Sequence, residues 1–236
     1  MADDTLIRPI SDQSERRWTV TLDGLPVQHV TLLKIEHPRF GTLAYGVTPT
    51  GYDGWSFHEV GGGGAVVVPF VILDGDVYVA VVKQVRHNQG GPVWNVPRGF
   101  IEPGENHANA ARRELVEETG YQRGPMNLEA LEGDPANPNS AFFETSNPEE
   151  GVKFFALEAP AADVQHAGEE IVFQSRALSP DTAPRYAEMI AEARFIHWTS
   201  AARLGDMFTV AAVSRLLAHL HDAGRVTVSV GARHGQ

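Results

Sequence analysis

The chain has 236 residues, 42% of them hydrophobic, and 19 Lys and Arg against 30 Asp and Glu leave a net charge of −11 with His neutral. This length and hydrophobic fraction suffice for the core of one sizeable domain with a smaller appendage, which argues against a disordered chain. The acidic balance argues against a nucleic-acid binder, because such proteins usually carry a basic face. The absence of cysteine excludes disulfide bonds, thiolate metal sites and a cysteine nucleophile.

The N-terminal sequence shows no signal for transport to or across a membrane. It reads MADDTLIRPISDQSERRW, which lacks a basic start followed by an apolar run. No stretch of the chain approaches the ~18 consecutive apolar residues of a membrane span. We therefore expect a cytoplasmic protein without a membrane partner.

The composition of the chain changes near residue 60. Residues 18–47 alternate apolar and polar side chains between Gly, Pro and Asp, which predicts strands and hairpins. Four consecutive glycines, Gly61 to Gly64, follow as either a flexible joint, which we favour, or a close approach of two backbone segments. The prediction is a β-rich N-terminal extension at 1–60, which is a candidate dimerisation region, ahead of a second domain at 61–236.

The second domain opens with two strands that the sequence predicts to be central in a sheet. Residues 65–73 and 77–85 are apolar on both faces, which is typical of strands buried on both sides. They flank an Asp-Gly pair, which favours the tight turn of a β-hairpin.

The rest of the second domain mixes strands and helices. Residues 151–159 and 193–200 predict strands, and the long mixed stretch 160–191 predicts a loop with helical pieces. Residues 209–224 predict an amphipathic helix that ends at a glycine. Its buried face is predicted to contain Ala212, Leu216 and Leu220. The predicted fold class is α+β, with strands and helices in no periodic order.

A helix predicted at 107–119 carries three carboxylates on one face. Asparagine, a good N-cap residue, precedes it, and Gly120 stands where a helix commonly ends. At about 100° per residue, Glu114, Glu117 and Glu118 fall within an arc of about 100°, where like charges repel. Either this face is simply solvated, or the carboxylate oxygens gather around a hard divalent cation such as Mg²⁺ or Mn²⁺.

Seven residues between positions 99 and 121 stand at fixed spacings: Gly99, Glu105, Arg113, Glu114, Glu117, Glu118 and Gly120. They match every fixed position of the Nudix box, G-x5-E-x7-R-E-U-x-E-E-x-G-U with U a bulky aliphatic residue, and the segment therefore resembles that family. Tyr121 at the last U position is bulky and apolar. VWNVPRGFI before the box resembles the strand that enters it, and RLGDMFTVAAVSRLL resembles the closing segment, where an Asp and a Thr precede the last helix.

The resemblance implies a Nudix fold, which is a mixed β-sheet sandwiched between helices, and hydrolysis of a pyrophosphate linkage. Such a reaction brings water to phosphorus among anionic oxygens, so divalent Mg²⁺ or Mn²⁺ must neutralise charge. By resemblance, Glu114, Glu117 and Glu118 bind the metal, and Glu114 and Glu118 are catalytic. A backbone carbonyl near Arg98 and Gly99 is implied as a further ligand. Structural support of the site is assigned to Gly99, Glu105, Arg113 and Gly120.

Two arginines and one glutamate outside the core of the box complete the predicted site. Arg86 in KQVRH and Arg98 are predicted to bind substrate, since relatives have a phosphate-binding arginine at the position of Arg86; an ordinary surface arginine is the alternative. For the general base we choose Glu170 in HAGEEIVF, although a base from within the box is also open. The other glutamates that qualify by position are Glu144, Glu149, Glu150, Glu169 and Glu188.

The substrate prediction rests on features around the box. The N-terminal strands, the motif WNVPRGFIEPGE and Pro135 look most like ADP-ribose and nucleoside-diphosphate-sugar pyrophosphatases. This resemblance implies that ADP-ribose is cleaved to AMP and ribose 5-phosphate by a homodimer whose N-terminal strands help to build the site. Candidates for stacking on the nucleobase, unless they are core or turn residues, are Tyr45, Trp55, Phe57 and His58.

Two alternatives stay open at the level of the sequence. One is a Nudix hydrolase of another substrate, such as a dinucleoside polyphosphate, a nucleotide sugar or a modified nucleoside triphosphate, because the box fixes the chemistry and not the groups beside the pyrophosphate. The other is a non-catalytic nucleotide-binding module. Such a module would normally lose one of the metal-binding glutamates, and all three are present.

Overall fold

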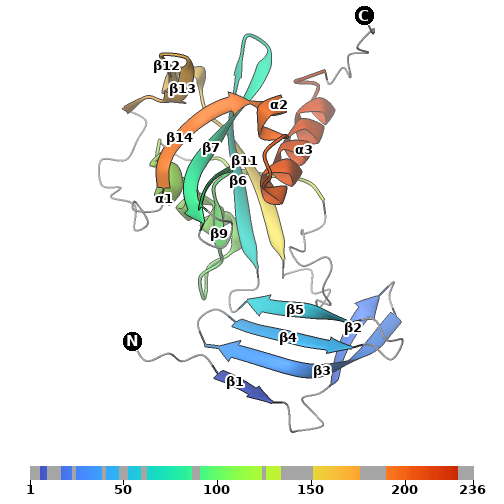
Figure 1. Ribbon diagram of the computed structural model, residues 1–236. Helices are drawn as coiled ribbons and strands as arrows, with labels where there is room; N and C mark the ends of the chain where they lie inside the picture. The colour runs from blue at the N-terminus through green and yellow to red at the C-terminus, as the bar shows by residue number, and fades with distance from the viewer. Residues whose placement is uncertain are drawn as a thin grey trace, which may run out of the picture. The chain divides into compact units, whose positions relative to one another are not determined.

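The computed structural model describes residues 6–9, 17–22, 25–38, 41–47, 53–59, 63–86, 91–123, 126–133, 151–175 and 190–227. The described residues within 1–64, 100–107 and 134–153 form one compact unit, and those within 65–99, 108–133 and 154–236 form a second. Figure 1 shows the strands and helices of both units. The division at residue 60 into an extension and a catalytic domain stays a prediction.

The first unit contains an antiparallel sheet in the order β1-β3-β4-β5, with β2 also paired to β3 (Figure 1). Its strands are β1 (Leu6–Pro9), β2 (Arg17–Leu22), β3 (Leu25–His37), β4 (Gly41–Val47) and β5 (Asp53–Glu59). The strands and hairpins predicted at 18–47 are confirmed. Tyr45 on β4 is paired in register with Trp55 on β5. The backbones of all four proposed stacking residues therefore lie on two neighbouring strands.

The second unit is built around a larger sheet in the order β10-β11-β6-β7-β14-β13-β12, with β8 paired to β7 and β9 to β6. Its first strands are β6 (Gly64–Leu73), β7 (Asp76–Arg86), β8 (Gly91–Asn95), β9 (Arg98–Phe100) and β10 (Glu129–Ala130). The later ones are β11 (Val152–Glu158), β12 (Val164–Ala167), β13 (Glu170–Phe173) and β14 (Ile190–His197). The predicted central strands at 65–73 and 77–85 correspond to β6 and β7.

The turn between β6 and β7 has the conformation that its Asp-Gly pair favours. Leu73 is paired in register with Asp76, and the two residues between them, Asp74 and Gly75, have φ angles of 51° and 89°. Positive φ at both central residues is the signature of a type I′ turn, whose twist matches that of the flanking strands. The hairpin predicted from the sequence is confirmed.

The larger sheet is mixed, because β11 runs parallel to β6 while the β6–β7 pair is antiparallel. Gly64 N–H bonds Gly151 O at 3.2 Å and Ala159 N–H bonds Phe70 O at 2.7 Å, so the residue numbers rise together along the two strands. Side chains of both strands are buried on both faces, as in sheets that are covered on two sides.

Helices α1 (His107–Thr119) and α3 (Met207–Asp222) lie on opposite sides of β6 and β7 (Figure 1). The short helix α2 (Trp198–Ala201) precedes α3. The predicted buried face of the last helix is confirmed by Ala212, Leu216 and Leu220, whose exposed fraction is 0%. The structure thus has the mixed sheet between helices that the sequence predicts. No helix within the described ranges combines the length and the apolar character that crossing a membrane requires.

Two predicted boundaries and one predicted loop were wrong. The strand predicted at 193–200 ends at His197, because this residue caps the new helix α2 by accepting a hydrogen bond from Thr199 N at 3.3 Å. The last helix begins at Met207 and not at Thr209, because Asp206 is its N-cap. The loop predicted at 160–191 contains, besides the short 3₁₀ turn Ala161–Asp163, the hairpin β12–β13. Strands of four residues give too short a pattern to distinguish from a loop.

The glycine run meets another backbone segment at Gly63. This residue has φ 122°, and a Cβ atom added to it would overlap the backbone of Gly151. Of the two interpretations of the run, close backbone approach therefore applies at Gly63. Gly61 and Gly62 lie outside the described residues, and so does Pro135.

Candidate active site

The box helix α1 spans His107–Thr119, which are the predicted bounds. Its buried apolar face includes Ala110, Ala111 and Leu115, all with an exposed fraction of 0%. Gly120 follows with φ 71°, and its N–H bonds Val116 O at 2.8 Å, so the glycine ends the helix in the left-handed conformation. The structural role predicted for Gly120 is consistent with this geometry.

The box carboxylates are sheltered from solvent. Glu114 and Glu118 have exposed fractions of 8% and 7%, and Glu117 is half-buried. A buried carboxylate loses its hydration, so it requires hydrogen-bond donors or positive charge close by. The alternative that the sequence left open was an ordinary solvated helix face. Such a face does not have two buried glutamates.

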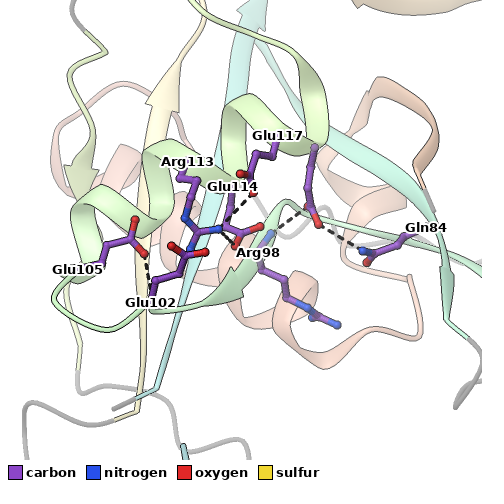
Figure 2. A network of polar contacts seen from close by, with 8 residues as sticks. Gln84, Arg98, Glu102, Glu105, Arg113, Glu114 and Glu117 are labelled. Carbon is purple, nitrogen blue, oxygen red and sulfur yellow. Dashed lines mark hydrogen bonds and ion pairs between the residues drawn. The ribbon is translucent and has the colours of Figure 1, made fainter. Parts of the chain in front are cut away.

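Arg113 lies between two of these carboxylates (Figure 2). Its Nη1 atom donates to Glu114 Oε1 at 2.5 Å and to Glu117 Oε2 at 3.2 Å. One guanidinium therefore offsets the repulsion between two carboxylates on the same helix and holds both in place. The pair with Glu117 joins residues one helical turn apart, and the contact with Glu114 joins neighbours in the sequence.

Glu118 is held by donors from two strands. Its Oε2 atom accepts from Arg98 N at 3.1 Å, and its Oε1 atom accepts from Gln84 Nε2 at 3.4 Å. Sequence reasoning missed Gln84. It stands on β7 in the motif KQVRH, the same motif from which Arg86 was predicted to bind substrate, and that motif was the signal for it.

Gly99 provides the space in which the Glu114 carboxylate lies. A Cβ atom at residue 99 would overlap that carboxylate, including its Oε1 atom. Only glycine allows the side chain of α1 to approach the backbone of β9 so closely. The glycine at this position thus gives a carboxylate of the box room against the β9 backbone.

Glu105 closes the turn that precedes the helix. Its Oε2 atom accepts from Glu102 N at 3.1 Å, and its own N–H bonds Glu102 O at 2.9 Å. These two bonds fix the turn through Pro103 and Gly104, where Gly104 has φ 83°. The contacts agree with a supporting role of Glu105 in the loop.

Tyr121, the last residue of the box, is anchored by its hydroxyl group. The hydroxyl donates to Asp163 Oδ2 at 3.0 Å, and the ring stacks on Phe173 with centroids 4.6 Å apart. Arg123 forms an ion pair with the same Asp163, which has an exposed fraction of 0%. Burial raises the pKa of Tyr121 above its usual value of 10.0, and Arg123 partly opposes that shift. A tyrosine at this position thus connects the end of α1 to a buried carboxylate.

The donor chemistry of the box fits a hard divalent cation. It offers three carboxylates on one helix beside a glycine that admits Glu114, and Mg²⁺ and Mn²⁺ prefer such oxygen ligands. Among the described residues, no three acidic or histidine side chains converge closely enough to hold a metal ion. Arg113 holds Glu114 and Glu117, whereas the Arg98 N–H holds Glu118. The metal-binding roles of the glutamates stay predictions.

Of the two arginines predicted to bind substrate, the structure describes the side chain of Arg98 but not that of Arg86. Arg86 ends β7, and its side chain lies outside the described part of the chain. Arg98 donates from Nη1 to Asp206 Oδ2 at 2.7 Å, and its guanidinium lies over the ring of Phe208 at 4.7 Å. The guanidinium of Arg98 is therefore already bound by protein groups, and its substrate role stays a prediction.

The structure does not bring Glu170 together with the box carboxylates. Glu170 on β13 forms an ion pair with Arg194, whose guanidinium lies 4.2 Å from the ring of Trp94. Trp94 is paired in register with Lys83. Since side chains alternate along a strand, these residues lie on the face opposite to Gln84, whose side chain reaches Glu118. Of the other candidate bases, Glu144, Glu149, Glu150 and Glu188 lie outside the described residues, and Glu169 is exposed in the β12–β13 turn.

Comparisons with known proteins show the family of the chain. Residues 64–199, more than half of the chain, match the model of the NUDIX domain family. The chain is 33% identical over 104 residues to "Nucleoside diphosphate-linked moiety X motif 6" of Mus musculus, covering 44% of this chain and 31% of that protein. It is 52% identical over 44 residues to "ADP-sugar pyrophosphatase" of Mus musculus, covering 19% and 20%. The matched regions thus span about a third or less of these curated relatives.

Among solved structures, "Crystal structure of ADP compounds hydrolase" aligns over 94% of this chain and 97% of that chain, with 16% identity and a TM-score of 0.44. The family match covers the box and strands β6 to β14, and it ends at Thr199, inside helix α2. The chain therefore belongs to the Nudix family.

Proposed function

We propose that the chain is a metal-dependent Nudix hydrolase that cleaves the pyrophosphate bond of a nucleoside diphosphate derivative, with ADP-ribose as the preferred substrate. The observation that carries this proposal is the sheltered set of carboxylates on α1, where Glu114 and Glu118 are buried beside the backbone of Gly99. A charged side chain is costly to bury, so two buried glutamates beside the half-buried Glu117 on one helix support a task that needs them. Pyrophosphate hydrolysis is the task that their oxygen chemistry supports.

The proposed reaction adds one water molecule across a phosphoanhydride bond. The water oxygen forms a bond to one phosphorus, the bond from that phosphorus to the bridging oxygen breaks, and the bridging oxygen leaves with the other phosphate. From ADP-ribose the products are AMP and ribose 5-phosphate. Mg²⁺ or Mn²⁺ would supply charge neutralisation and a more acidic water.

The roles of the residues follow from their contacts. Glu114, Glu117 and Glu118 would hold the metal, with Arg113 fixing the first two and the Arg98 N–H fixing the third. Gly99 and Glu105 shape the loop before α1, and Gly120 ends it. Arg86 is proposed to contact a substrate phosphate. The general base is proposed to be either Glu170 or a glutamate of the box, and the opposite placement of Glu170 in the sheet favours the box.

The choice of ADP-ribose has two supports. The local match to "ADP-sugar pyrophosphatase" is the most identical of the relatives compared above, although it covers 44 residues. The first unit also presents Tyr45 and Trp55 as cross-strand neighbours, and aromatic side chains are suitable for stacking on a nucleobase. We further propose a cytoplasmic homodimer in which the N-terminal strands contribute to the site. Sedimentation of the purified chain would give the oligomeric state.

The function is tested by turnover of the purified full chain with a panel of substrates and Mg²⁺. The panel contains ADP-ribose, other nucleoside diphosphate sugars, a dinucleoside polyphosphate and a modified nucleoside triphosphate. We expect metal-dependent release of AMP and ribose 5-phosphate from ADP-ribose at the highest kcat/KM. Glu118→Gln should lower that value by at least about 100-fold, because it removes a charge from the metal site.

Glu129→Gln is the matched control. Glu129 is an exposed glutamate outside the box, and its Oε2 atom lies 2.8 Å from His219 Nε2. This substitution should leave turnover unchanged. If no compound of the panel is hydrolysed in a metal-dependent manner, the enzymatic proposal is wrong. If another compound is preferred, only the ADP-ribose assignment fails.

A further inference from the structure

Asp206, at the start of α3, accepts three hydrogen bonds through a single oxygen. Its Oδ2 atom is 2.7 Å from Arg98 Nη1, 2.9 Å from Thr209 N and 2.7 Å from Thr209 Oγ1. Asp206 and Thr209 are both buried, and Arg98 is 108 residues away in the sequence. Three donors around one buried carboxylate oxygen hold it in a fixed place.

The hydroxyl group of Thr209 extends this arrangement to the strand before the box. Because the hydroxyl donates its proton to Asp206, its lone pairs remain to accept a bond, and Val96 N–H donates to Thr209 Oγ1 at 3.0 Å. Val96 and Thr209 both have an exposed fraction of 0%. Without the hydroxyl, the Val96 N–H would lose a buried acceptor.

The segment 96–98 is tied to three different elements by three successive residues. Val96 N–H bonds Thr209 on α3, Pro97 O accepts from Val67 N on β6 at 2.9 Å, and Arg98 N–H bonds Glu118 on α1 at 3.1 Å. The last of these bonds holds the Glu118 carboxylate. A displacement of the segment at Val96 therefore moves the donor that orients Glu118.

We propose that Asp206 and Thr209 are positioning residues of the active site, which act through the segment 96–98 to fix Glu118. In this arrangement the guanidinium of Arg98 serves as a partner of Asp206 and not as a phosphate ligand. The inference rests on the proposed function, since it assigns a task to Glu118 that only a metal-dependent site requires. An N-cap that merely stabilises α3 would explain the bond from Thr209 N, but not the bonds from Val96 N and Arg98 Nη1.

The test compares Thr209→Val, which removes the hydroxyl at nearly constant volume, with Thr209→Ser, which keeps it. Thr199→Val is the matched structural control: Thr199 Oγ1 lies 2.7 Å from His197 Nδ1 at the start of α2, and neither residue touches the segment 96–98 in the contacts described above. For each full-length variant, the dissociation constant of Mn²⁺ is measured by electron paramagnetic resonance without substrate. Thermal unfolding and kcat and KM for ADP-ribose with Mg²⁺ are measured in parallel.

We expect Thr209→Val to weaken Mn²⁺ binding by about 10-fold or more and to lower kcat, as do changes in residues that orient metal ligands. Thr209→Ser should stay within about 2-fold of the original chain, since its hydroxyl makes the same bonds. Thr199→Val should change thermal stability alone. Equal Mn²⁺ affinity in Thr209→Val and Thr209→Ser, or an equal loss in Thr199→Val, would overturn the proposal.

If Thr209→Val does not fold, Arg98→Met tests the same proposal, because Arg98→Met leaves the N-cap of α3 intact. The positioning role predicts weaker Mn²⁺ binding and a lower kcat with little change in KM. Unchanged Mn²⁺ binding together with a raised KM would assign Arg98 to the substrate and overturn the proposal. Mn²⁺ affinity separates this inference from the proposed function. If the original chain binds Mn²⁺ but hydrolyses none of the substrates, the proposed function is wrong. If the original chain is active and Thr209→Val changes neither Mn²⁺ affinity nor kcat, the positioning role is wrong.

Discussion

Two sets of carboxylates in the second unit pair with arginine and differ in how the pairs are held. On α1, Glu114 and Glu118 are buried, Glu114 lies against the backbone of Gly99, and Glu118 receives a backbone N–H. On the opposite face of the sheet, Glu170 meets Arg194 with 42% of its side chain exposed. There the only partners described are other side chains, including the ring of Trp94.

Rigid backbone contacts, more than ion pairs, distinguish the carboxylates of the box from Glu170. Exposed ion pairs contribute little to stability, because water and salt screen them and two long side chains must be ordered. A carboxylate fixed by a backbone donor, as Glu118 is, or by a steric limit, as Glu114 is, has few alternative positions, which is what metal binding requires. The following changes test this distinction, beginning with the largest expected effect.

Gly99→Ala should have the largest effect, because its Cβ atom would overlap the Glu114 carboxylate. Moving that carboxylate or the β9 backbone disrupts the site, so we expect kcat/KM for the preferred substrate to fall by about 100-fold or more. Turnover and Mn²⁺ affinity are the measurements. Gly205→Ala is the control, because nothing lies within 4 Å of a Cβ atom there. Activity of Gly99→Ala close to that of the original chain would show that the steric limit is unimportant.

Tyr121→Phe separates burial of a carboxylate from a role in catalysis. It removes the hydroxyl bond to Asp163, which is as buried as the box glutamates but lies beyond the end of α1. Losing one partner of a buried carboxylate should lower the free energy of unfolding by about 1–3 kcal/mol. We expect kcat/KM to change by less than about 3-fold, as measured by turnover beside urea unfolding at pH 7. A large loss of activity in a folded variant would contradict this separation.

The same tyrosine predicts a dependence of stability on alkaline pH. Its pKa is raised by burial, so the folded state retains the phenol proton to higher pH than the unfolded state does. The contribution of Tyr121 to the free energy of unfolding is complete below pH 10.0, the usual pKa of the phenol. It decreases as the pH rises from there through the pKa of Tyr121 in the folded state. Urea unfolding between pH 9 and 11 should show a steeper loss of stability for the original chain than for Tyr121→Phe.

The parts of this structure that were predictable from the sequence are those with local causes. The helix at 107–119 followed from helix formers and a terminal glycine, and the β6–β7 turn followed from its Asp-Gly pair. Contacts between distant residues were not predictable: Gln84 with Glu118 spans 34 positions, and Val96 with Thr209 spans 113. Such contacts depend on how the strands and helices pack, which no local pattern specifies.

Glu170→Gln should have the smallest effect, because it alters the half-exposed pair on the face away from the box. The pair with Arg194 contributes at most about 1 kcal/mol, and we expect kcat/KM to stay within about 2-fold of the original chain. A pH–rate profile taken beside the turnover measurement is decisive. If Glu170 were the general base, the variant would fold normally, lose activity by about 100-fold and lose the acidic limb of the profile. An unchanged acidic limb would exclude Glu170 and leave the buried carboxylates of α1, together with the other candidate glutamates, as the proton acceptor.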